Sequence, residues 1–86
     1  MGINMAQINS QVRQLREQAT ALREAQLSLL SYQHNLNVHW KGTEMVPTNQ
    51  ALERHIKKIA EIAVDLDYIG NDIIREAEAV KREEEE

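Results

Sequence analysis

The three histidines are the side chains of this 86-residue chain that could take part in the widest range of chemistry, from acid–base catalysis to metal binding. His34 and His39 are five positions apart, a spacing that does not place two side chains on one helical face. His39 and His55 lie on either side of a predicted bend and would meet there if the chain folds back on itself. No carboxylate pair completes a recognisable ligand set. We therefore predict exposed histidines and neither metal nor cofactor, whereas a metal-binding enzyme would need His39 and His55 as ligands.

Other kinds of activity find little support in the composition. The chain has no cysteine, no Ser-His-Asp arrangement and no glycine-rich phosphate loop, so we predict that it is not an enzyme. A net charge of −4 argues against nucleic-acid binding. No apolar run approaches the roughly 20 residues that cross a bilayer, and the N-terminus lacks a signal-peptide pattern. We expect no stable membrane insertion.

The first half of the chain has the pattern of one amphipathic helix, over about residues 4–39. Asn4 is placed to cap it, with Gln7 three residues later, and Ile3 and Ile8 can form a hydrophobic staple. From Ile8 onward, seam positions recur at alternating spacings of four and three, as in a coiled coil. They are Ile8, Val12, Leu15, Ala19, Leu22, Gln26, Leu29, Gln33, Leu36 and Trp40.

Two glutamines interrupt this apolar seam. Gln26 and Gln33 either lie at a partly hydrated stretch or bond to a neighbouring helix. Alternatively, they fix register or partner choice, as polar seam residues can. We favour the first interpretation.

The bend is predicted over about residues 40–47. Gly42 can adopt the positive φ that often ends a helix. Thr43 can cap the next helix directly. Because proline is tolerated only in a first helical turn, Pro47 alternatively moves the start to Thr48 or Asn49.

A second helix is predicted over about residues 48–80, followed by a frayed acidic tail at 81–86. Folding about residues 43–44 would place Ala19 level with Gly70 and Val12 level with Ala77. The small side chains there would allow close helix approach. The second seam consists of Leu52, Ile56, Ile59, Ala63, Leu66, Gly70, Ile73, Ala77 and Val80.

The predicted fold is all-α, a single antiparallel helical hairpin. Its apolar stripe is wider than a two-stranded seam requires, because Ile62, Ile69 and Ile74 flank it. Two helices alone bury little core, so we expect hairpins to pair into a four-helix bundle dimer. The seam residues expected to matter most are Leu15, Leu22, Leu29, Leu36, Ile59, Leu66 and Ile73.

Trp40-Lys41-Gly42 at the single break between two heptad runs resembles the WxG helical-hairpin family of type VII secretion, relatives of the small early secreted antigen of mycobacteria. The family also carries a Tyr-x-x-x-Asp/Glu export motif, which Tyr68 and Asp72 match. The i, i+4 spacing puts these two side chains on one helical face, off the seam. The short chain is also similar to small partner proteins of LXG-domain toxins in Gram-positive bacteria.

The resemblance implies a protein that is cytoplasmic before export and then secreted without a cleaved signal peptide, through an apparatus driven by a secretion ATPase. It implies a homodimer, or a heterodimer with another hairpin or with an LXG toxin's N-terminal region. Trp40, Gly42, Tyr68 and Asp72 would form the recognition motif. The alternative hypothesis is a cytosolic structural or adaptor coiled coil with no export role.

Overall fold

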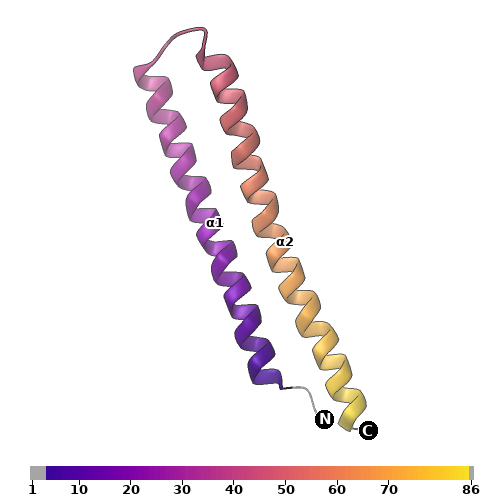
Figure 1. The fold of residues 1–86 in the computed structure, drawn as a ribbon. Coiled ribbons are helices and arrows are strands. Elements are labelled where there is room, and N and C mark those ends of the chain that lie inside the picture. The colour runs from indigo at the N-terminus through magenta and orange to yellow at the C-terminus, as the bar shows by residue number, and fades with distance from the viewer. Residues whose placement is uncertain (1–3, 86) are drawn as a thin grey trace.

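The computed structural model describes residues 4–85 and contains two long helices, α1 (Met5–His39) and α2 (Met45–Glu85). The helices run antiparallel, side by side along their length (Figure 1). This confirms the all-α hairpin. Its radius of gyration is 19.7 Å, against about 12 Å for a globular domain of this length. The molecule is therefore a rod with a thin core.

Helix α1 begins where the sequence predicts. The Asn4 side chain accepts a hydrogen bond from the Gln7 backbone N–H at 3.1 Å, which confirms the predicted cap. The Ile8 N–H donates to the Asn4 carbonyl oxygen at 3.1 Å. The staple predicted for Ile3 lies outside the described residues. The cap therefore gives α1 a defined start four residues before the first seam position.

Helix α1 ends without a left-handed glycine. Trp40 leaves the helix in an extended conformation (φ −129°, ψ 119°), and its N–H donates to the Leu36 carbonyl oxygen at 2.8 Å. No glycine among the described residues has positive φ, so the predicted role of Gly42 is wrong. A Cβ added at Gly42 would lie 2.9 Å from Glu44 Oε2, the mobile end of a side chain. The backbone itself does not require glycine there.

Helix α2 differs from its expected bounds at both ends. It starts at Met45 rather than 48, with Pro47 inside its first turn, where no backbone N–H is needed. It continues to Glu85 rather than fraying at 81, since Arg82 lies in the last turn and Glu, Lys and Arg are good helix formers. Residues 40–44 make the whole bend.

The core is the row of small residues between the helices. The buried residues are Val12 and Ala19 on α1, and Met45, Ile56, Ala63, Gly70 and Ala77 on α2. A Cβ built on Gly70 would lie 3.1 Å from Val12 Cγ1, so Gly70 faces Val12 and not Ala19. The Asn37–Asn49 and Arg16–Asn71 bonds centre on residues 43 and 43.5, which agrees with the predicted fold about 43–44, but the side chain that meets Gly70 is Val12 rather than Ala19.

Candidate association surface

One long side of the hairpin is polar. Arg23 bonds Asp67 across the helices at 2.6 Å, and Arg16 donates to Asn71 Oδ1 at 3.1 Å. Each of these four residues comes one or four positions after a buried residue, which places them on the same side of the two helices. The large aliphatic residues come four positions before a buried residue. Because helical positions repeat every seven residues, they lie together on the opposite side.

That opposite side, which we call the association face, carries an aliphatic row from each helix. The α1 row is partly buried throughout, and the α2 row becomes more exposed toward the C-terminus, with Ile73 37% exposed. Ile62 and Ile69 extend the face on α2 and are 39% and 48% exposed. Its residues are Ile8, Leu15, Leu22, Leu29, Leu36, Leu52, Ile59, Ile62, Leu66, Ile69, Ile73 and Val80.

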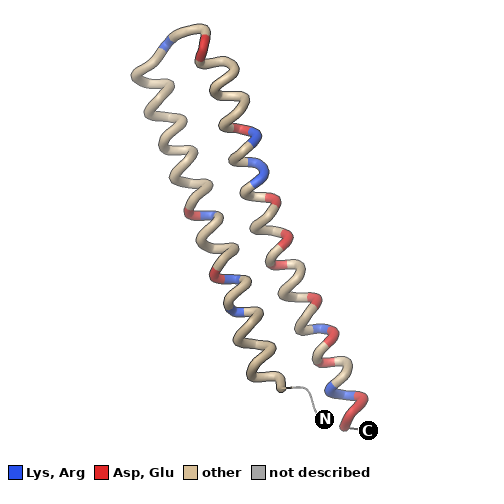
Figure 2. The backbone as a smooth tube through the Cα atoms, viewed as in Figure 1, with Lys and Arg blue, Asp and Glu red and all other residues tan. Residues whose placement is uncertain are grey.

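Charge is absent from much of α1. Residues 25–40 contain no Asp, Glu, Lys or Arg, and Figure 2 shows this half of the helix in tan, without blue or red. Nearer the N-terminus, the positions beside the aliphatic row are Gln11 and Gln18, which are also uncharged. The α1 half of the association face therefore presents only aliphatic and neutral polar groups, as the buried part of an interface does.

An amide cluster joins the helices near the bend. Asn37 and Asn49 bond reciprocally: Asn37 Nδ2 donates to Asn49 Oδ1 at 2.9 Å, and Asn49 Nδ2 donates to Asn37 Oδ1 at 2.8 Å. Gln33 Nε2 also donates to Asn49 Oδ1 at 3.1 Å. Gln33 thus bonds to the neighbouring helix, as the favoured interpretation has it. Asn37 and Asn49 were not foreseen, although Asn49 continues the α2 seam by one heptad before Ile56.

The four motif residues fall into two separate places. Trp40 is 60% exposed at the bend, beside the partly buried Gly42. Tyr68 is 65% exposed on α2, and Asp72, one turn later, pairs with Arg75. Measured along α2 from its start to Tyr68, the separation is about 35 Å. One chain therefore does not bring the Trp and Tyr motifs together.

The described residues hold no arrangement suited to metal chemistry. No three His, Asp or Glu side chains among residues 4–85 are grouped to hold an ion. His39 Nδ1 instead lies 2.9 Å from the carbonyl oxygen of Asn35, in its own helix. Neither helix, over the same residues, is long and apolar enough to span a membrane.

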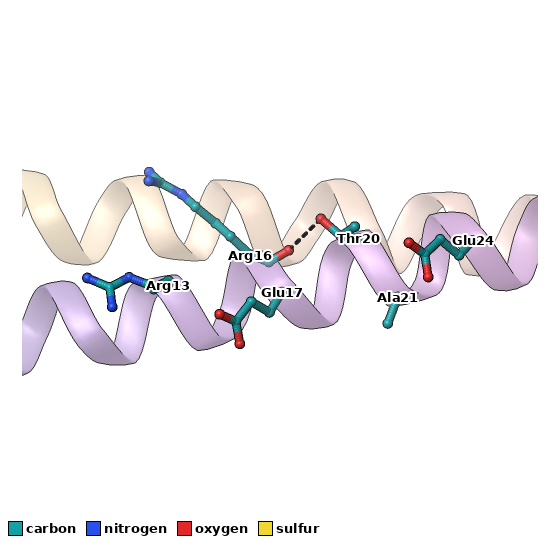
Figure 3. A pocket seen from close by; sticks show the side chains of 6 residues that line it. All are labelled: Arg13, Arg16, Glu17, Thr20, Ala21 and Glu24. Carbon is teal, nitrogen blue, oxygen red and sulfur yellow. Dashed lines mark hydrogen bonds between the residues drawn. The ribbon is translucent and has the colours of Figure 1, made fainter.

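The surface hollow drawn in Figure 3 is formed by α1 alone. In it the Thr20 hydroxyl donates to the Arg16 carbonyl oxygen at 3.0 Å. Its lining residues are Arg13, Arg16, Glu17, Thr20, Ala21 and Glu24. Because successive turns of one helix make the hollow, it is a depression on the rod rather than a cleft between elements.

Comparison with known proteins adds no relative. No protein-family model, curated protein or solved structure matches the chain.

Proposed function

We propose that this chain is a small protein of type VII secretion, either exported itself or acting as a helical targeting partner for a larger effector of the LXG type. Its activity would be assembly and recognition, with no catalytic step. The observation that carries the proposal is the association face, a continuous aliphatic side that a single hairpin leaves partly open to solvent. Such a face is typical of a helix that packs against further helices.

Recognition would use the exposed residues that remain outside this face. Trp40 and Gly42 lie at one end of the rod, and Tyr68 and Asp72 lie on the outer side of α2. Both pairs stay accessible when helices cover the association face. Because about 35 Å separates them in one chain, a composite signal requires the bend of a second chain beside Tyr68. The chain would be cytoplasmic until the secretion ATPase drives export.

The first test is fractionation of the tagged protein from host cells with the secretion ATPase intact or deleted. We expect protein in the medium only when the ATPase is present. Trp40→Ala and Tyr68→Ala should each reduce export while leaving the helix content, measured by circular dichroism, largely intact. Tyr32→Ala is the matched control, because Tyr32 is a similarly exposed tyrosine outside the motif. Unchanged export of both motif variants would refute the proposal.

Gly42→Ala separates a backbone role from a recognition role. Since Gly42 has no positive φ and an added Cβ meets only the end of the Glu44 side chain, folding should tolerate the substitution. If Gly42→Ala abolished export while the midpoint of urea unfolding stayed unchanged, the secretion apparatus would have to recognise the motif itself.

The second candidate function is a cytosolic adaptor coiled coil, favoured by the association face taken alone. Partner binding would then depend on aliphatic residues such as Leu22 and Leu66, and Tyr68 would be dispensable. Protein confined to the cytoplasm in both strains would favour this function.

A further inference from the structure

The two halves of the rod are held together in different ways. We call residues 26–39 and 45–56, next to the bend, the bend half, and residues 8–22 and 60–80 the core half. The core half contains the tightly packed small residues between the helices. In the bend half α1 has no buried residue, and α2 has only the two with which its part begins and ends. Apolar packing between the helices is therefore concentrated in the core half.

Amide groups take the place of apolar packing in the bend half. At the heptad spacing, the buried row of α1 passes from Ala19 to Gln26 and Gln33, and the row of α2 leads back from Ile56 to Asn49. The bonds of the amide cluster are the side-chain hydrogen bonds between the helices here, and they are part-buried. Because such bonds replace bonds to water, they add much less stability than buried apolar surface does.

The α1 segment of the bend half is also a weak helix in its own right. It carries no charged residue, so no i, i+4 ion pair supports it. Residues 10–25 consist mainly of Ala, Leu, Arg, Gln and Glu, which favour helix. Most positions of residues 26–39 hold residues of lower helix propensity, which are Ser28, Ser31, Tyr32, His34, Asn35, Asn37, Val38 and His39. This segment therefore depends on contacts with α2, where apolar packing is sparse.

We propose that the bend half opens as a unit while the core half stays folded, and that the amide cluster is the contact that holds the bend half closed. In the open state, the chain between the two helices of the core half forms one long loop. Because the entropic cost of closing a loop rises only slowly with its length, the core half loses little stability when the bend half opens. The proposal concerns a motion within one hairpin and does not depend on export.

The opening affects the two motif sites differently. Trp40 and Gly42 lie in the bend that joins the two segments of the bend half, whereas Tyr68 and Asp72 lie in the core half. The association face includes aliphatic residues from both halves, so a helical partner that covers its whole length binds only the closed state. Such a partner shifts the population toward that state. Its binding therefore fixes the position of Trp40 and leaves that of Tyr68 unchanged.

Native-state hydrogen exchange of the full chain, followed for each backbone amide by NMR at one protein concentration, tests the separate opening. After correction for intrinsic exchange rates, the amides of residues 28–38 should exchange about tenfold or more faster than those of residues 12–22. Low concentrations of urea should accelerate exchange less in the bend half, because its opening exposes less surface than global unfolding does. Equal protection and equal urea dependence in the two halves would overturn the proposal.

Variants in each half give a sharper test. Ala21→Gly changes an exposed position of the core half. It should accelerate exchange of the core half about fivefold and leave the bend half within about twofold, because the core half stays folded when the bend half opens. Asn49→Ala should accelerate exchange about fivefold or more in both halves, since global unfolding also breaks the amide cluster.

Asn71→Ala is the matched control, because Asn71 is an asparagine of α2 that bonds to Arg16 within the core half. It should leave exchange of the bend half unchanged. If Ala21→Gly accelerated exchange equally in both halves, the hairpin would unfold as one unit and the proposal would be overturned. Unchanged exchange of the bend half in Asn49→Ala would overturn the role of the amide cluster. Neither result depends on whether the chain is exported.

Discussion

The contact between Gly70 and Val12 makes the helix register measurable. In Gly70→Ala, the better helix propensity of alanine contributes about 1 kcal/mol of stability. The new Cβ lies 3.1 Å from Val12 Cγ1, closer than ordinary packing, and Val12 is 1% exposed with a stiff side chain. Such overpacking costs about 1–3 kcal/mol. We expect a net loss of about 1 kcal/mol.

The same substitution in a Val12→Ala background should behave differently. The clash is removed there, so Gly70→Ala should stabilise by about 1 kcal/mol. The expected coupling between the two positions is about 2 kcal/mol. Urea unfolding followed by circular dichroism measures it, at one fixed protein concentration because association contributes to stability. If Val12→Ala proves too unstable, all four proteins can be compared in the same concentration of osmolyte.

Ala19→Gly supplies the control background, because the sequence pairs Gly70 with Ala19 and the structure does not. The effects of Ala19→Gly and Gly70→Ala should simply add. Coupling to Ala19 instead of Val12, or a gain of about 1 kcal/mol from Gly70→Ala in every background, would refute the observed register.

Two further predictions concern the links between the helices. Asn49→Ala should lower the free energy of unfolding by about 1–3 kcal/mol, because the part-buried amides of Asn37 and Gln33 lose their partner across the helices. The double variant Asn37→Leu/Asn49→Leu should lower it less. Urea unfolding measures both, and an equal or greater loss in the double variant would contradict the role of the cluster. Arg23→Ala should change the free energy of unfolding by no more than about 1 kcal/mol, since the ion pair between Arg23 and Asp67 is well exposed. The difference in unfolding free energy should shrink in high salt. A loss that persists in about 1 M salt would show that packing rather than charge is involved.

The helices and their seams were predictable because each depends on residues close together in the sequence. Asn4 reaches only to Gln7, and Val12 and Ala19 repeat at the heptad spacing. The pairing between helices is not local in this sense. The predicted fold about residues 43–44 agrees with the Asn37–Asn49 and Arg16–Asn71 bonds. The individual contact was not predictable: Gly70 meets Val12 and not Ala19.

The amide cluster was missed because its members are polar. A fold about residues 43–44 sets Asn37 level with Asn49, but the seams were traced from aliphatic residues, and the second seam was started at Leu52, one turn after Asn49. Gly42 illustrates a different difficulty. A glycine two residues after a helix suggests a left-handed cap, yet the chain leaves α1 through Trp40 in an extended conformation. The sequence pattern alone does not distinguish a helix that ends in a left-handed glycine from one that ends in an extended residue.

Trp40 gives the molecule a built-in optical reporter. It is the only indole in the chain, there is no phenylalanine, and it projects at one end of the rod with 60% of its surface exposed. Its fluorescence should therefore resemble that of an indole in water, and hairpin closure alone should scarcely shift it. A partner that covers the bend would move the emission to shorter wavelength, whereas one that covers only the middle of the association face would not. The emission wavelength of Trp40 thus shows whether a partner covers the bend or only the middle of the rod.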